Sequence, residues 1–164
     1  MNSLNVTIRK AENQDVSAIF NLLSPHIKSG IVLSRDEENI RSNINSFYVA
    51  ECSGKIGGCV AVRDFGGNLF EIRSLAVDDD YRRCGIGSML VNRAVWDISE
   101  RCAEWKTFTL TIHPDFFLKL GFKLVDFRFP EKIWADCENC AKKDSCDEVA
   151  LLITSEDAQT SQRV

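Results

Sequence analysis

The sequence predicts an α/β fold in which one mixed β-sheet is flanked by helices. The first observation behind this prediction is that segments with strand-like alternation are interspersed with segments whose apolar residues recur at helical spacing. The second is the order of these segments, which is β-α-α-β-β-β-α-β-α-β-β. The length of 164 residues and the apolar fraction of 45% suit one domain with a sizeable core. We predict that single domain over residues 1–153.

The predicted strands alternate apolar and polar residues, or are short apolar runs bounded by turn residues. They cover residues 4–8, 47–52, 56–65, 69–77, 108–112, 122–127 and 149–153. Glycine-containing turns at 53–55 and 66–68 connect the three central strands, which indicates hairpins there.

The predicted helices have apolar residues three or four positions apart, as one buried helix face requires. They cover residues 16–23, 35–45, 85–102 and 116–120. Pro25 is expected to end the first helix, followed by a loop over 26–33, and Gly121 is expected to end the last. Residues 154–164 are polar and are expected to form a flexible C-terminal tail.

Composition excludes several classes of function. The net charge of -4 and the pI of about 5.2 argue against nucleic acid as a partner, because phosphate backbones require a basic surface. Neither a signal peptide nor an apolar stretch long enough to span a bilayer is seen, so we expect no membrane partner and a cytoplasmic location. The seven cysteines are then expected to be mostly reduced.

The strongest functional signal is the segment Arg-Arg-Cys-Gly-Ile-Gly-Ser at 82–88, which follows a strand and opens the longest helix. Gly85 and Gly87 let the backbone approach an anion closely, and the free N–H groups of the first helical turn can hold a phosphate. For an isolated Gly-x-Gly, a glycine-rich helix start without a ligand is the alternative. No Gly-Lys-Ser/Thr follows, so the segment is not a P-loop, and its spacing is too short for a dinucleotide fingerprint.

In this context the chain resembles the GCN5-related N-acetyltransferase (GNAT) family. Arg82, Gly85 and Gly87 fill the family signature Arg/Gln-x-x-Gly-x-Gly/Ala, after a strand that ends in Ser-Leu-Ala-Val at 74–77. The segment Phe-Phe-Leu-Lys-Leu-Gly-Phe at 116–122 is similar to the second landmark of the family, an aromatic pair followed by Gly-Phe. The resemblance covers residues 6–153 and implies a mostly antiparallel GNAT sheet.

The resemblance also implies acetyl-CoA as cosubstrate and a mode of binding it. The backbone of 83–88 would hold the pyrophosphate, and the main chain of Leu75 and Val77 would pair with the pantetheine arm. The residues implied to bind the cofactor are Leu75, Ala76, Val77, Arg82, Arg83, Cys84, Gly85, Ile86, Gly87, Ser88 and Phe117. Because most of these donors are backbone amides, an acidic protein can still bind this polyanion.

Acetyl transfer requires a base that removes a proton from the acceptor amine. Glu71 is the candidate, because it interrupts an apolar strand six residues before Val77; an exposed carboxylate on that strand is the alternative. Arg73 shares its face of the strand and could neutralise Glu71, bind a substrate carboxylate or form a structural salt bridge. Many family members have a tyrosine at the position of Phe117 that protonates the leaving thiolate, so this sequence identifies no general acid.

The acceptor is inferred mainly from resemblance. The segment 30–38 resembles the acceptor loop of bacterial N-acetylglutamate synthases, and the segment 130–148 resembles their short single-domain members. This implies L-glutamate as acceptor and a role in the first step of arginine biosynthesis. Cations are needed for its carboxylates. The candidates are Arg35 as first choice, Arg73, Lys28 and Lys132, and each could instead be a solvated surface charge.

Cys137, Cys140 and Cys146 lie in a cysteine-bearing insertion over 130–147. We expect no metal there, and reduced thiols or one disulfide suffice to explain the pattern. A structural zinc site is the alternative, although it would need a fourth ligand.

Two alternative functions stay open at this point. One is acetylation of another amine, such as a polyamine, a drug or a protein N-terminus. The other is a non-catalytic acetyl-CoA sensor. The family resemblance also makes a homodimer plausible.

Overall fold

The computed structural model describes residues 4–29, 35–133, 136 and 146–162. The chain divides into two compact units, one formed by Met1–Arg63 and Ile72–Ile98 and the other by Asp64–Glu71 and Ser99–Val164. Strand β4 (Leu69–Val77) contributes its first residues to the second unit and the remainder to the first. The strands are hydrogen-bonded in the order β1-β2-β3-β4-β5-β7-β6, which makes a mixed seven-stranded sheet.

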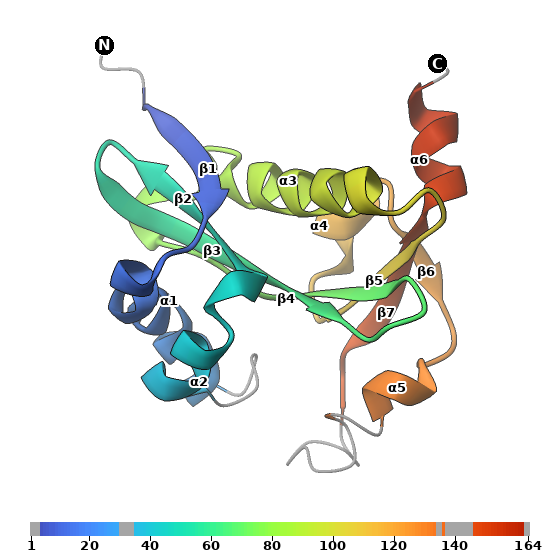
Figure 1. The fold of residues 1–164 in the computed structure, drawn as a ribbon, viewed down its shortest axis with the longest axis horizontal. Coiled ribbons are helices and arrows are strands. Elements are labelled where there is room, and N and C mark those ends of the chain that lie inside the picture. The colour runs from blue at the N-terminus through green and yellow to red at the C-terminus, as the bar shows by residue number, and fades with distance from the viewer. Residues whose placement is uncertain (1–3, 30–34, 134–135, 137–145, 163–164) are drawn as a thin grey trace. The chain divides into compact units, whose positions relative to one another are not determined.

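In the first unit, β1 (Val6–Lys10), β2 (Phe47–Cys52) and β3 (Lys55–Asp64) are antiparallel neighbours. Helices α1 (Val16–Lys28) and α2 (Glu37–Ser42) cover one face of these strands (Figure 1). Helix α3 (Ile86–Arg101) covers the other face. Tyr48 of β2 donates a hydrogen bond to Asp97 of α3, with 2.6 Å between the Tyr48 Oη and an Asp97 carboxylate oxygen.

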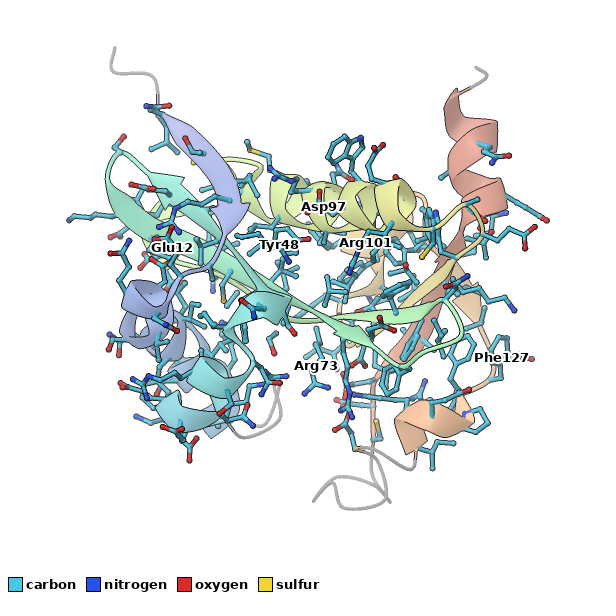
Figure 2. All side chains as sticks on the ribbon, viewed as in Figure 1. Glu12, Tyr48, Arg73, Asp97, Arg101 and Phe127 are labelled. Atoms are coloured by element: carbon cyan, nitrogen blue, oxygen red, sulfur yellow. The ribbon has the colours of Figure 1, made fainter. Side chains whose placement is uncertain are left out.

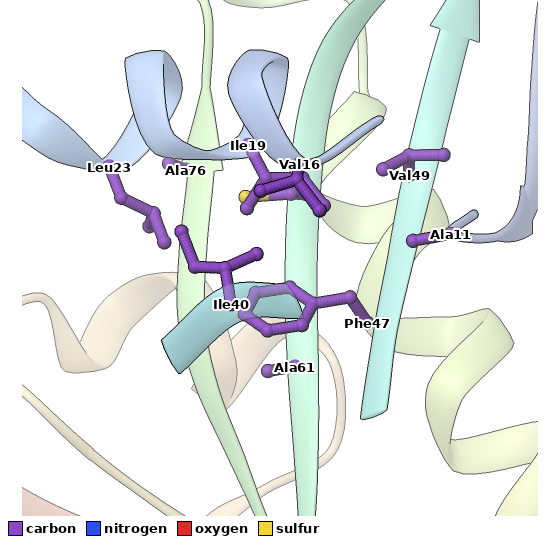
Figure 3. Close-up of a cluster of buried hydrophobic side chains, with 10 residues drawn as sticks. Ala11, Val16, Ile19, Leu23, Ile40, Phe47, Val49, Ala61 and Ala76 are labelled. Carbon is purple, nitrogen blue, oxygen red and sulfur yellow. The ribbon is translucent and has the colours of Figure 1, made fainter. Parts of the chain in front are cut away.

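The core of this unit joins α1 and α2 to the sheet (Figure 3). Its members are apolar side chains from the helices and from alternating strand positions, as half-buried strands require. They are Ala11, Val16, Ile19, Leu23, Ile40, Phe47, Val49, Cys59, Ala61 and Ala76.

Gly58 of β3 lies on the opposite face, beneath α3. A Cβ atom added there would lie 3.0 Å from Ile86 Cγ2, 3.1 Å from Leu90 Cδ1 and 3.3 Å from the carbonyl oxygen of Ala76. The absence of a side chain therefore lets the first two turns of α3 approach the strand closely.

In the second unit, the start of β4 pairs in parallel with β5 (Lys106–Thr111), and β7 (Val149–Thr154) lies antiparallel to both β5 and β6 (Lys123–Val125). Its helices are the short α4 (Pro114–Lys119) and α5 (Pro130–Lys132), and α6 (Ser155–Gln162). Tilted aromatic rings connect the sheet to the segment before α5. Phe108 lies 5.9 Å from Phe65 and 4.8 Å from Phe129, measured between ring centroids.

The mixed sheet flanked by helices is confirmed, and so is the predicted order of elements up to β6; the structure adds helix α5 before β7 and helix α6 after it. The bounds of β2 and β4 coincide with the sequence prediction. The prediction that Pro25 ends the first helix is wrong, because α1 continues to Lys28. A proline removes one N–H donor, and Pro25 and Asn21 are both exposed, so water can solvate the carbonyl that loses its partner.

The sequence predicts a flexible C-terminal tail over residues 154–164, and the structure has a helix, α6, over Ser155–Gln162 of that segment. Asp157 accepts hydrogen bonds from the backbone N–H and the hydroxyl of Thr154, and its own N–H donates back to that hydroxyl. This capping box begins the helix. The single domain over residues 1–153 stays a prediction. Among the described residues, no helix is long and apolar enough to cross a membrane.

Candidate functional site

The candidate phosphate-binding turn lies in the first unit, between β4 and α3. A single 3₁₀ turn, Asp79–Tyr81, follows the strand, and the backbone N–H of Asp78 donates to the Gly57 carbonyl at 2.8 Å. Arg83 and Gly85 then have left-handed φ values of 66° and 77°. Left-handed residues that alternate with other residues in a turn direct neighbouring backbone N–H groups toward one side, which makes an anion-binding concavity.

The turn is open to solvent. Arg82, Arg83, Cys84 and Gly85 are exposed, whereas Ile86 anchors the start of α3 in the core with 1% exposure. The N–H groups of the first helical turn have no intrahelical acceptor by the geometry of any α-helix, and the helix dipole adds positive potential there. The structure therefore brings together the residues that the sequence predicts for this turn, in a shape suited to a phosphate.

The strand that leads into the turn is irregular at Ser74. This residue has a φ of 54°, which is uncommon for a residue other than glycine in a strand. After it, Ala76 is buried in the core cluster, while Leu75 and Val77 are half-buried.

Glu71 lies in the second unit and is 2% exposed. Its carboxylate pairs with the ammonium of Lys132, whose Nζ is 2.8 Å from Oε2 and 3.2 Å from Oε1. Lys132 Nζ also lies 2.8 Å from Asp136 Oδ2, one helical turn further along the chain. The three side chains are 2%, 7% and 12% exposed in the order Glu71, Lys132, Asp136, so this is a buried charge cluster.

A third carboxylate lies close to this cluster. Burial raises the pKa of Glu148, and Lys132 and Arg128 oppose that effect. Arg128 also donates to the Glu148 backbone carbonyl at 2.6 Å. Sequence reasoning missed Asp136 and Glu148. The four-residue spacing from Lys132 to Asp136 was a local signal for their pairing.

The other predicted acceptor cations lie in the first unit. Arg35 is half-buried with its guanidinium 5.5 Å from the centre of the Phe47 ring. Arg73 is half-buried and extends from β4 on the face away from α3 (Figure 2). Lys28 is exposed in the last turn of α1.

Phe117 is 5% exposed and packs edge-on against Phe116 and Phe122, with ring centroids 5.0 and 5.3 Å away. Cys137 and Cys140 lie outside the described residues. Cys146 is exposed, with Sγ 4.0 Å from Glu148 Oε1. Among the described residues no group of histidine, cysteine, aspartate or glutamate side chains is arranged to hold a metal ion.

Comparison with known proteins identifies the class. The family model of the acetyltransferase (GNAT) domain matches residues 43–124. An uncharacterized N-acetyltransferase of Chlorobaculum tepidum is 39% identical over 155 residues, which cover 94% of this chain and 99% of that protein. The chain therefore belongs to the GNAT acetyltransferase family. This membership confirms the predicted enzyme class and acetyl-CoA as cosubstrate.

More distant relatives have named substrates. An amino-acid acetyltransferase of Mycobacterium tuberculosis is 30% identical over 122 residues, which cover 73% of this chain and 69% of that protein. The amino-acid acetyltransferase of Shewanella oneidensis is 32% identical, and the match covers 73% of this chain but only 27% of that longer protein.

Solved structures share the fold. The N-acetylglutamate synthase of Neisseria gonorrhoeae, in complex with coenzyme A and N-acetyl-glutamate, superposes with a TM-score of 0.79 at 23% identity. The match covers 93% of this chain and 36% of that one. A Mycobacterium tuberculosis protein in complex with coenzyme A gives a TM-score of 0.77 at 25% identity, covering 90% and 98% of the two chains.

Proposed function

We propose that this enzyme transfers the acetyl group of acetyl-CoA to the α-amine of an amino acid, with L-glutamate as the acceptor. The observation that carries the chemistry is the buried carboxylate of Glu71, on the strand that leads into the phosphate-binding turn. The choice of glutamate is supported by the similarity to amino-acid acetyltransferases over 73% of the chain.

The coenzyme A pyrophosphate binds the amides of the turn from Arg83 to Ser88, where positive φ values and the start of α3 provide donors. Arg82 and Arg83 are exposed beside it and add positive charge. The pantetheine arm pairs with the main chain of Leu75 and Val77. Cys84 is part of this turn but needs no chemical role, because direct transfer uses no enzyme nucleophile.

In the reaction, Glu71 accepts a proton from the acceptor ammonium, directly or through water. The neutral amine attacks the thioester carbonyl carbon, so that a C–N bond forms as the C–S bond breaks. Coenzyme A leaves as the thiolate, and the proton lost by the amide nitrogen passes to the thiolate or to water. Phe117 has no proton to give, so no side chain is assigned as the general acid.

The acceptor carboxylates require cations, and Arg35 is the first candidate. Its half-buried guanidinium is held over the Phe47 ring, which restricts its orientation as a carboxylate ligand requires. Arg73 and Lys28 are the second and third candidates. A place in arginine biosynthesis, a cytoplasmic location and a homodimer stay predictions.

The test is release of free thiol from acetyl-CoA with a panel of amines: L-glutamate, other amino acids, spermidine and a peptide. We expect turnover with glutamate and a KM for glutamate raised about tenfold or more by Arg35→Ala, since a charged hydrogen bond contributes about 1.5–3 kcal/mol. Arg41→Ala is the matched control, because Arg41 is an exposed arginine of α2 that pairs with Glu38 at 3.1 Å.

Turnover with a different amine would keep the enzyme class and remove glutamate as the acceptor. Measurable acetyl-CoA binding without turnover of any amine would favour the sensor alternative. Equal KM values for glutamate in Arg35→Ala and Arg41→Ala would remove Arg35 from the acceptor site.

A further inference from the structure

In the charge cluster of the second unit, Lys132 is surrounded by carboxylates. Its ammonium is enclosed between the carboxylates of Glu71 and Asp136, both 2.8 Å away. The lysine side chain is 7% exposed, so its charge is compensated within the protein interior. A lysine that serves a free acceptor carboxylate would instead keep its charge available for the ligand.

We propose that Lys132 is a positioning residue for acetyl transfer: its ammonium holds the Glu71 carboxylate in place and supplies a positive charge beside it. Glu71 can then take up the proton of the acceptor amine. This inference rests on the proposed function only through the role of Glu71 as the base. It reassigns Lys132, which the sequence analysis places among the acceptor-binding cations.

The packing of the second unit explains how Lys132 reaches Glu71, although 61 residues separate them in the chain. Glu71 is the register partner of Phe108 in the parallel pairing of β4 and β5. The Phe108 ring stacks against Phe129 at 4.8 Å, and Phe129 is the N-cap of α5. The backbone N–H of Lys132 donates to the Phe129 carbonyl at 3.0 Å. The contact between Phe108 and Phe129 therefore links the strand pair that holds Glu71 to the helix that holds Lys132.

Electrostatics gives the pair a role beyond packing. A buried carboxylate without a counter-charge retains its proton, and a protonated Glu71 could not act as a base. Asp136 shares the ammonium of Lys132 at 2.8 Å, so removing Asp136 and removing Lys132 change the charge around Glu71 in opposite directions. Among the residues that the structure describes, the charged groups around the cluster include Lys132, Asp136, Glu148, Asp147 and Arg128.

The experiment is the pH profile of kcat/KM for two variants that should move it in opposite directions. In Lys132→Met the carboxylate loses the positive charge of Lys132, so we expect the acid limb to move to higher pH by about one unit, with kcat/KM lowered about tenfold at pH values on that limb. In Asp136→Asn a negative charge is lost and Asp136 no longer competes for the ammonium, so we expect the acid limb to move to lower pH.

Two further variants control for other causes. Lys132→Arg keeps the charge and is expected to leave the acid limb near its wild-type position. Lys123→Met removes an exposed lysine that pairs with Asp157 at 2.8 Å, and is expected to leave the profile unchanged. If Lys132→Met does not fold, the downward shift in Asp136→Asn decides alone.

Coincident acid limbs in wild type and Asp136→Asn would overturn the proposal and leave the pair as a structural salt bridge. A raised acceptor KM in Lys132→Met with an unmoved acid limb would overturn it as well, and would return Lys132 to the acceptor site. The shifts of the acid limb should be the same with every amine that the wild type acetylates. Turnover with another acceptor would therefore refute glutamate as the acceptor but would leave the role proposed for Lys132 unchanged. If no amine is used, carboxyl ¹³C NMR of Glu71 decides: opposite shifts of its titration midpoint in the two variants support the proposal, and an unmoved midpoint refutes it.

Discussion

A methyl group added at Gly58 should lower the free energy of unfolding of the protein and weaken its affinity for coenzyme A. In Gly58→Ala the new Cβ would meet Ile86 Cγ2 at 3.0 Å, Leu90 Cδ1 at 3.1 Å and the Ala76 carbonyl oxygen at 3.3 Å. Ile86 and Leu90 are 1% and 0% exposed, so neither side chain has room to move outward, and a backbone oxygen cannot rotate away. Relief therefore requires α3 to shift away from the sheet.

Overpacking of this kind costs about 1–3 kcal/mol of unfolding free energy. For a chain of this size the melting temperature should fall by roughly 2–12 °C. The part of the strain that displaces the start of α3 also disorders the amide donors of the turn, and each 1.4 kcal/mol of it raises the Kd for coenzyme A about tenfold.

The assays are thermal unfolding and calorimetric titration with coenzyme A. Gly54→Ala is the control, since Gly54 has a φ of 89° but nothing within 4 Å of an added Cβ. The free energy of unfolding of Gly54→Ala should fall by about 1–2 kcal/mol because of backbone strain, whereas its Kd for coenzyme A should equal that of wild type. A Gly58→Ala protein with wild-type melting temperature and wild-type Kd would refute the idea that this glycine seats α3.

Three further outcomes are expected. Glu71→Gln should lower kcat about 10²–10⁴-fold with little change in the Kd of coenzyme A, and wild-type turnover would end its role as base. Asp15→Asn removes the buried partner of Arg9 and should lower the free energy of unfolding by about 3 kcal/mol at pH 7. Glu51 pairs with the same arginine but has an exposed side chain, so Glu51→Gln should lower it by under about 1 kcal/mol. Residue-resolved alkylation at pH 8 should label Cys84 and spare Cys59, and coenzyme A should slow labelling of Cys84; equal rates with and without it would contradict binding at the turn.

The Asp15 prediction has a definite pH dependence. Burial alone would raise the pKa of Asp15, but hydrogen bonds from Arg9 and from the Glu12 backbone outweigh it and lower the pKa. A lowered folded-state pKa means that the stabilisation is present above the unfolded pKa of about 3.9 and is lost as the pH falls below it. The advantage of wild type over Asp15→Asn should therefore shrink below about pH 4.

The contrast between the two cysteines follows from burial. Cys59 is fully buried in the core cluster of the first unit, and this burial raises the pKa of its thiol to about 12. Only the thiolate reacts with alkylating agents, so Cys59 is inert at pH 8. Cys84 is exposed in the turn and lacks that protection.

Local signals in the sequence were sufficient for much of the fold. The turn residues on either side of β2 and β4, and the alternation within them, gave their bounds without error. The position of the proposed phosphate-binding turn between β4 and α3 was also predictable because its residues are contiguous, although the left-handed conformation of Arg83 was not. The sequence also contains a signal for the start of α6, since Thr154 and Asp157 have the spacing of a capping box. The polar composition of residues 154–164 led instead to the prediction of a flexible tail.

Other features depend on contacts that no local pattern contains. The pairing of Glu71 with Lys132 joins residues 61 positions apart and depends on ring packing between β5 and the start of α5. Arg73, which is near Glu71 in sequence, was the only neighbour considered for the carboxylate, and the ion pair with Lys132 was not predicted. The continuation of α1 through Pro25 depends on solvent exposure, which the sequence does not specify.

The construction of the phosphate-binding turn has a consequence for how pH acts on this enzyme. Backbone amides do not ionise in the physiological range, and the guanidinium groups beside them keep their charge throughout it. Donor binding at Arg83 to Ser88 should then vary little between pH 6 and 9, apart from ionisation of coenzyme A itself. Any dependence of turnover on pH would then arise in the chemical step. A fall in cellular pH would lower the rate of acetyl transfer while coenzyme A stayed bound.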